Sequence, residues 1–226
     1  MSEISVELSK IDKKYSDKSV LSALDLKIKK SAVTSVIGPN GSGKTTLFKI
    51  ILSITDPDNG HILADKEMKT GFLIEDLRPY ENLNLMQNLA AFSLLEGKHV
   101  SASDAEDIIT MSFCKDICRK PIKKLSAGQK RKAYFAFSLL SDPDLIILDE
   151  PLNSLDLKER IDLISSIKYL RDSRSKTIVI SSHDLDSLYE ICDTFCFLKD
   201  GRIERIMDKK EIAQSELNSI FMELYG

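Results

Sequence analysis

Hydrophobic residues near the start of the chain alternate with polar ones. Ile4, Val6 and Leu8 fall on one side of an extended segment, and residues 24–28 alternate in the same way. A period of two is typical of a strand with one buried face. Residues 32–37 form a more apolar run, which we also interpret as a strand. The first part of the chain is therefore predicted to be mostly sheet.

Helical and strand patterns then follow one another. Residues 45–52 have the apolar spacing of a helix, which turn-forming residues at 56–60 bring to an end. Further along, two buried-type strands are predicted at 145–148 and 177–180, with an amphipathic helix at about 158–171 between them. This strand–helix–strand order predicts an α/β fold with a mostly parallel central sheet.

The middle of the chain has a different character. From about residue 75 to residue 124 the apolar residues recur at helical spacing. A chain of 226 residues with 42% hydrophobic content has room for one ordinary core. We therefore predict a single domain over 1–226, with its core at 1–74 and 131–226 and an inserted α-helical subdomain at about 75–130.

Composition excludes several classes of function. The chain has 32 basic and 35 acidic residues, a formal charge of -3, which argues against a nucleic-acid partner. We see neither an apolar run of the roughly 18 to 20 residues that span a membrane nor a signal peptide at the start. Four cysteines form two C-x-x-x-C pairs, which we expect to be buried, reduced thiols in the cytoplasm.

A phosphate-binding loop is predicted directly after the strand at 32–37. The pattern G-x-x-x-x-G-K-[ST] is matched there, and the helix that follows completes the expected context. Backbone N–H groups and the helix N-terminus bind phosphate, the lysine adds a positive charge, and the threonine offers a hydroxyl to Mg²⁺. The residues expected to bind ATP here are Gly38, Pro39, Asn40, Gly41, Ser42, Gly43, Lys44, Thr45 and Thr46.

Two carboxylates follow the second buried strand. Asp149 and Glu150 stand at its carboxyl end, where open α/β sheets bind their ligands. We expect Asp149, with Thr45, to hold Mg²⁺, and Glu150 to orient or deprotonate the attacking water. Together with Lys44, these residues predict an enzyme that hydrolyses a nucleoside triphosphate.

A third motif narrows the class. Leu125 is followed by Ser126, Ala127, Gly128 and Gln129, and this run closely resembles the L-S-G-G-Q signature of the ATP-binding cassette (ABC) ATPases. The alanine in third place departs from the usual glycine. The resemblance implies a P-loop fold with a small antiparallel β region, and two subunits that dimerise head to tail around two ATP molecules. The partner would be a second copy of this chain or a close homologue.

The remaining positions of that family also occur in order. Tyr15 would stack on adenine with Val20 beside it, and Asp156 belongs to the D-loop at 152–156. Glu75 stands where the Q-loop usually has glutamine, and would be a further Mg²⁺ ligand. A glutamate at this position is similar to the branch of the family typified by bacitracin-type and lantibiotic-immunity exporters. His183 matches the switch histidine that contacts the γ-phosphate, so the implied catalytic residues are Glu150, His183 and Lys44.

Three functions remain open at this point. The resemblance favours an ATPase subunit on the inner face of the cell membrane that powers a separate transmembrane permease, with Arg78, Pro79 and Tyr80 near the contact and export as the direction. A soluble ABC ATPase that acts as a cytoplasmic assembly factor would keep the same motifs. A nucleic-acid-linked ABC protein would need a second cassette, a coiled coil or a basic surface, which we do not see.

Overall fold

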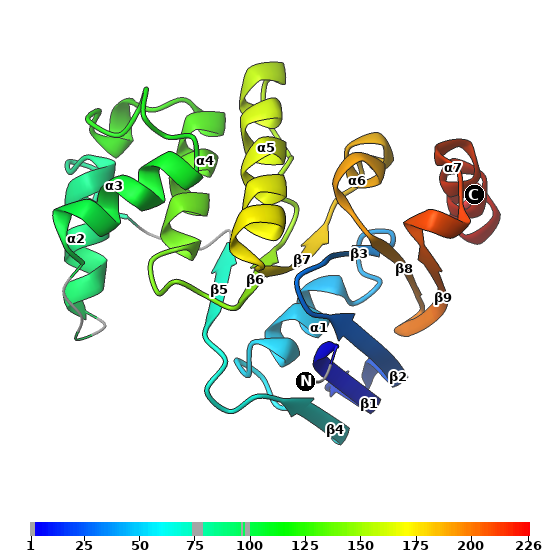
Figure 1. Ribbon diagram of the computed structural model, residues 1–226. Helices are drawn as coiled ribbons and strands as arrows, with labels where there is room; N and C mark the ends of the chain where they lie inside the picture. The colour runs from blue at the N-terminus through cyan, green and yellow to red at the C-terminus, as the bar shows by residue number, and fades with distance from the viewer. Residues whose placement is uncertain (1–2, 74–78, 96, 98–99) are drawn as a thin grey trace.

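The computed structural model describes residues 3–73, 79–95, 97 and 100–226. Two sheets lie together at the centre of the described chain, and a lobe of helices lies to one side (Figure 1). The smaller sheet is antiparallel, with the strand order β2-β1-β4. Its strands are β1 (Ile4–Tyr15), β2 (Lys18–Lys29) and β4 (Asn59–Ala64). The predicted antiparallel region is therefore present.

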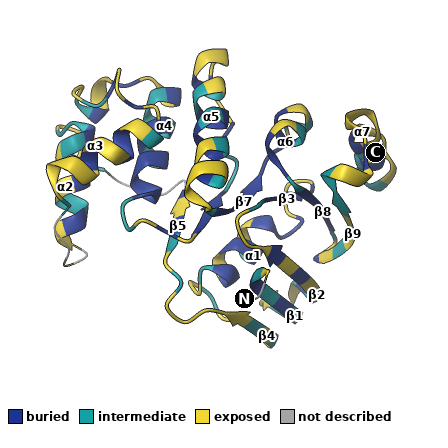
Figure 2. Cartoon of the chain, viewed as in Figure 1, coloured by how far each residue is buried: buried dark blue, intermediate teal, exposed yellow. Residues whose placement is uncertain are grey.

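The larger sheet has six strands in the order β5-β6-β7-β3-β8-β9. All its neighbouring strands are parallel except the pair β8 and β9. Every residue of β3, β6 and β7 is buried (Figure 2), because helices cover one face and α1 with the small sheet covers the other. The strands are β3 (Val33–Ile37), β5 (Thr70–Leu73), β6 (Leu145–Leu148), β7 (Thr177–Ser181), β8 (Thr194–Lys199) and β9 (Arg202–Asp208).

The helices divide between these two faces. Helix α1 packs with the small sheet and one face of the large sheet in a single apolar cluster. The other helices contribute to a second cluster with the opposite face. The α-helices are α1 (Lys44–Ile51), α2 (Leu85–Leu95), α3 (Ala102–Met111), α4 (Ala127–Ser138), α5 (Leu157–Arg174), α6 (Leu185–Ile191) and α7 (Gln214–Tyr225), and short 3-10 turns occupy Ile122–Lys124 and Lys209–Glu211. Among the described residues, we find no helix long and apolar enough to cross a bilayer.

Helix α4 joins the helical lobe to the core. It packs against β5 of the large sheet, and also against α3 and α5. The boundary that we predicted between residues 130 and 131 falls inside this helix. The signature residues thus lie at the start of α4, and the same continuous helix packs against the core further along.

The cysteines lie in apolar surroundings. Cys114, Cys192 and Cys196 are buried, Cys118 is partly buried, and all four are free thiols. Burial raises the pKa of Cys114 and of Cys196 to about 12. Because the thiolate is the reactive form, these two side chains act as small hydrophobic residues.

One ion pair joins the two sheets and gives a pH-dependent prediction. Lys29 Nζ on β2 lies 2.8 Å from Asp208 Oδ2 on β9, and Thr194 Oγ1 donates to Asp208 Oδ1 at 2.9 Å. The hydrogen bond from Lys29 holds the pKa of Asp208 below its ordinary value. Asp208→Asn should lower the free energy of unfolding at pH 7 by up to about 1 kcal/mol, since the pair is partly exposed.

The sign of the pH effect follows from that lowered pKa. The stabilisation is present above pH 3.8 and is lost as the pH falls through the lower value in the folded state. Urea unfolding between pH 7 and pH 3 measures the free energy of unfolding of the parent and of Asp208→Asn. Asp17→Asn, at an exposed position, is the control. Equal stability of parent and Asp208→Asn at every pH would contradict the assignment.

Candidate functional site

The loop between β3 and α1 is built to bind an anion. Gly41 and Gly43 have φ of 82° and 109°, a left-handed conformation that glycine adopts without a steric penalty. Gly43 is the N-cap of α1, and no side chain caps that end. The N–H groups of the first turn therefore remain available to a ligand, and the helix dipole favours a negative one.

Lys44 places its charge inside this loop. Its Nζ donates to the carbonyl oxygens of Gly38 at 2.7 Å and Pro39 at 3.2 Å. The residue is 7% exposed, and Nζ lies 3.9 Å from Glu150 Oε1. Burial lowers the pKa of Lys44, while the charges of Glu150 and Asp149 oppose that shift. The loop thus holds the ammonium group close to its own carbonyls and to the carboxylates opposite.

Asp149 is fixed by two hydroxyl groups. Thr45 Oγ1 donates to Asp149 Oδ2 at 2.7 Å, and Ser181 Oγ donates to Asp149 Oδ1 at 2.7 Å. A carboxylate and a hydroxyl at this separation are hard oxygen donors of the kind that Mg²⁺ prefers beside substrate phosphates. Thr45 and Asp149 therefore fit the metal that the sequence implies.

Glu150 faces the same space from a left-handed backbone. Its φ is 48°, and its N–H donates to Ser181 Oγ at 2.9 Å. His183 Nε2 lies 3.1 Å from Glu150 Oε1 and 3.2 Å from Asn40 Oδ1. Both neighbours are acceptors, which favours the histidine tautomer with its proton on Nε2.

The carboxylate of Glu150 is poised to accept a proton. Its Oε1 lies 3.1 Å from His183 Nε2 and 3.9 Å from Lys44 Nζ. Burial raises the pKa of Glu150, and the nearby charges of His183 and Lys44 partly offset that rise. A partly desolvated carboxylate with a raised pKa has the properties of a general base.

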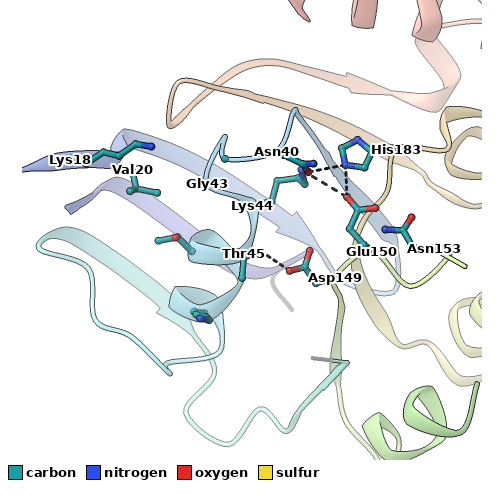
Figure 3. A pocket seen from close by; sticks show the side chains of 13 residues that line it. Lys18, Val20, Asn40, Gly43, Lys44, Thr45, Asp149, Glu150, Asn153 and His183 are labelled. Carbon is teal, nitrogen blue, oxygen red and sulfur yellow. Dashed lines mark hydrogen bonds and ion pairs between the residues drawn. The ribbon is translucent and has the colours of Figure 1, made fainter. Parts of the chain in front are cut away.

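These side chains meet in one cavity of about 600 Å³ (Figure 3). Two predicted groups from strands far apart in the sequence face each other across it, the P-loop after β3 and the carboxylates after β6. Val20 also lines the cavity, next to Gly43. The two residues are so close that a Cβ atom on Gly43 would lie 3.0 Å from the Val20 carbonyl oxygen. The lining residues are Lys18, Val20, Asn40, Gly41, Gly43, Lys44, Thr45, Thr46, Lys49, Asp149, Glu150, Asn153 and His183.

Some predicted site residues lie elsewhere. Tyr15 stands at the end of β1, where the residue is 47% exposed and Lys13 Nζ lies 5.7 Å from the ring centroid. Asp156 is the N-cap of α5 and accepts from Glu159 N at 2.8 Å. Neither residue lines the cavity. Glu75 and Arg78 lie outside the described residues.

The signature residues form a second helix start, away from the cavity. Ser126 caps α4 by accepting from Gln129 N at 3.0 Å, and its hydroxyl lies 3.3 Å from Glu159 Oε1. A Cβ on Gly128 would lie 1.7 Å from Glu159 Oε2, whereas Ala127 is exposed. A side chain at position 128 would therefore displace the Glu159 carboxylate, whereas the methyl group of the exposed Ala127 does not meet it.

Several contacts at the site have no strong signal in the sequence. Ser181 bonds to both Asp149 and Glu150, and the Arg131 guanidinium donates to the backbone carbonyl oxygens of the same two residues. Tyr225 donates to Ile37 O at 3.0 Å or Leu198 O at 3.1 Å, directly behind the P-loop. Such bonds join segments far apart along the chain, so local motifs do not reveal them.

Comparison with known proteins agrees with this geometry. Residues 21–153 match the family model described as ABC transporter. The lantibiotic transport ATP-binding protein SrtF of Streptococcus pyogenes is 30% identical, over 96% of this chain and 95% of its own. The zinc import ATP-binding protein ZnuC of Rickettsia prowazekii (strain Madrid E) is 31% identical, over 83% of this chain and 80% of its own.

A solved structure shares both fold and nucleotide chemistry. The ATP-binding cassette MJ0796, in a dimeric post-hydrolysis state bound to ADP and Pi, superposes with a TM-score of 0.78 at 25% identity. The match covers 90% of this chain and 98% of that one. With the P-loop, the paired carboxylates and the signature helix in place, the chain belongs to the ABC transporter family and is one of its ATP-hydrolysing ATP-binding subunits.

Proposed function

We propose that this chain binds ATP at the P-loop cavity, hydrolyses it as part of a head-to-tail dimer, and powers a separate membrane permease that exports its cargo. The main support for the ATPase site is that the uncapped start of α1 lies in one cavity with Lys44, Asp149 and Glu150. This combination binds phosphate, fits a metal and offers a base within a few ångströms.

Each residue has a defined task in that proposal. Lys44 and the free N–H groups of α1 would bind the β- and γ-phosphates. Thr45 and Asp149 would hold Mg²⁺, which when bound neutralises charge on the phosphate oxygens. Glu150 would accept the proton of the attacking water, and His183 would keep the Glu150 carboxylate in register.

The dimer follows from the position of the signature. Ser126 and Gly128 start α4 outside the P-loop cavity, so a nucleotide in that cavity does not touch them within one chain. We propose that they contact the ATP held by a second copy or a close homologue. The dimeric state of the related cassette MJ0796 supports this arrangement.

Export is proposed as the direction of transport. The lantibiotic transport relative aligns over 96% of this chain and 95% of its own length, a fuller match than the zinc import relative gives. A glutamate in the Q-loop position, here Glu75, is similar to the bacitracin-type and lantibiotic-immunity exporters. The chain would then act on the inner, cytoplasmic face of the cell membrane, where the helical lobe near Pro79 and Tyr80 contacts the permease.

Removing the P-loop charge tests nucleotide binding. Lys44→Ala should weaken ATP affinity by roughly 10- to 100-fold, because hydrogen bonds to charged groups contribute roughly 1.5–3 kcal/mol. Titration calorimetry with ATP in excess Mg²⁺ measures the change. The matched control is Lys49→Ala, which removes another lysine that lines the same cavity. Its affinity for ATP should fall much less than that of Lys44→Ala. Equal affinity of Lys44→Ala and the parent would contradict the phosphate-binding role.

Removing the base separates binding from turnover. Glu150→Gln should still bind ATP, stop multiple turnover and accumulate as an ATP-bound dimer, since the amide accepts no proton from water. Light scattering coupled to gel filtration with Mg²⁺-ATP gives the mass, and phosphate release gives the rate.

The control for that variant is Glu204→Gln, at an exposed position on β9. It should hydrolyse ATP like the parent and give the same dimer fraction as the parent. Steady turnover by Glu150→Gln at the parent rate would show that another group acts as the base.

A further inference from the structure

The backbone of Glu150 is held from both sides. Its N–H donates to Ser181 Oγ at 2.9 Å, and its carbonyl oxygen accepts from the Arg131 guanidinium. Between these two bonds the residue adopts a φ of 48°, which L side chains rarely occupy. The direction of the carboxylate depends on that backbone conformation, and therefore on both bonds.

Arg131 reaches this turn from α4. Its Nη2 also donates to the carbonyl oxygen of Asp149 at 3.1 Å, so one guanidinium bridges two successive carbonyls at the end of β6. Both bonds come from the two N–H groups of Nη2, whose directions the guanidinium plane fixes, whereas the three donors of a lysine ammonium rotate on a flexible stem. The bridge connects the helix that the signature begins to the pair of carboxylates in the cavity.

Two more contacts attach the first turns of α4 to the segment after Glu150. Lys132 is 3% exposed, and its Nζ donates to Asp162 Oδ2 on α5 at 2.7 Å. The Ser126 hydroxyl lies 3.3 Å from Glu159 Oε1, and Glu159 Oε2 accepts from Asp156 N at 3.1 Å. These bonds flank Arg131, so the start of α4, the Arg131 guanidinium and the backbone of Glu150 form one connected set of contacts.

We propose that Arg131 is a positioning residue that sets the orientation of Glu150 according to the placement of the signature helix. The inference rests on the proposed dimer, in which Ser126 and Gly128 contact the partner's nucleotide while Glu150 serves the nucleotide of its own chain. When the ATP of the partner binds to Ser126 and Gly128, Arg131 changes the orientation of Glu150. Glu150 is the base that acts on the ATP of its own chain. The two hydrolytic sites of the dimer are then coupled through α4 as well as across their shared interface.

The first test compares Arg131→Gln with Lys130→Gln, which removes the same charge from the neighbouring position on α4. Arg131→Gln should lower kcat by about 10- to 100-fold, the size of effect that a displacement of about 1 Å produces. The KM for ATP and the thermal midpoint should stay near those of Lys130→Gln, and the Hill coefficient for ATP should fall toward 1. Arg131→Lys, which keeps the charge but not the fixed geometry of the guanidinium donors, should be intermediate.

The second test is a double-mutant cycle with Ser126→Ala. If the signature acts on Glu150 through Arg131, Ser126→Ala with Arg131→Gln should lower kcat less than the product of the two single effects. Ser126→Ala with Lys130→Gln should give the product of its single effects. Since all variants keep the P-loop, ATP titration checks that each one still binds nucleotide.

The two tests together support or overturn the positioning role of Arg131. A lowered kcat at unchanged KM, with non-additive loss in the cycle, supports the positioning role. Turnover of Arg131→Gln equal to that of Lys130→Gln, a parallel loss of binding and thermal stability, or multiplicative losses in the cycle would overturn it while the proposed function stands. A parent chain that neither binds nor hydrolyses ATP would overturn both.

Discussion

The parallel arrangement of β3, β6 and β7 is the constraint on which the site depends. Parallel strands present their carboxyl ends at the same edge of a sheet, so the chain that leaves each strand enters the same region. From β3 comes the P-loop, from β6 come Asp149 and Glu150, and from β7 come Ser181 and His183. The buried apolar strands thus hold these groups within a few ångströms although the sequence separates them widely.

A second constraint concerns the two helix starts. The start of α1 has no side-chain cap and opens into the cavity, whereas Ser126 and Gln129 cap the start of α4. The Glu159 carboxylate already lies beside Ser126 and Gly128, so an anion approaching α4 meets a negative charge of the same chain. Within one chain, therefore, the start of α1 is open to a phosphate, whereas the start of α4 is occupied by its own cap and faces Glu159.

The sequence predicted the strands, the P-loop and the carboxylate pair because each is a local pattern. The apolar runs at 145–148 and 177–180 coincide with β6 and β7, and the glycine-rich loop opens α1 as expected. The fold class is confirmed by the related cassette structures and the family by the matched model. The roles assigned to individual residues remain predictions, Glu75 among them, since it lies outside the described residues.

What the sequence did not provide depends on contacts between distant segments. Nothing near Ala127 indicates that Gly128 lies against the Glu159 carboxylate, because that contact comes from another helix. Similarly, Arg131 is one of three successive basic residues, and only the approach of α4 to the end of β6 distinguishes it from Lys130. Such distinctions arise from packing, which a single sequence does not encode in a local pattern.

On the proposed function, ATP turnover in this chain drives a separate membrane protein. The most direct measurement is purification of the tagged full chain from its native membranes in mild detergent, followed by identification and quantification of whatever remains bound. We expect a polytopic membrane protein in stoichiometric amount, released from this chain by high detergent. Recovery from the soluble fraction alone, with cytosolic partners, would contradict the transport role and favour an assembly factor that uses the same ATPase site.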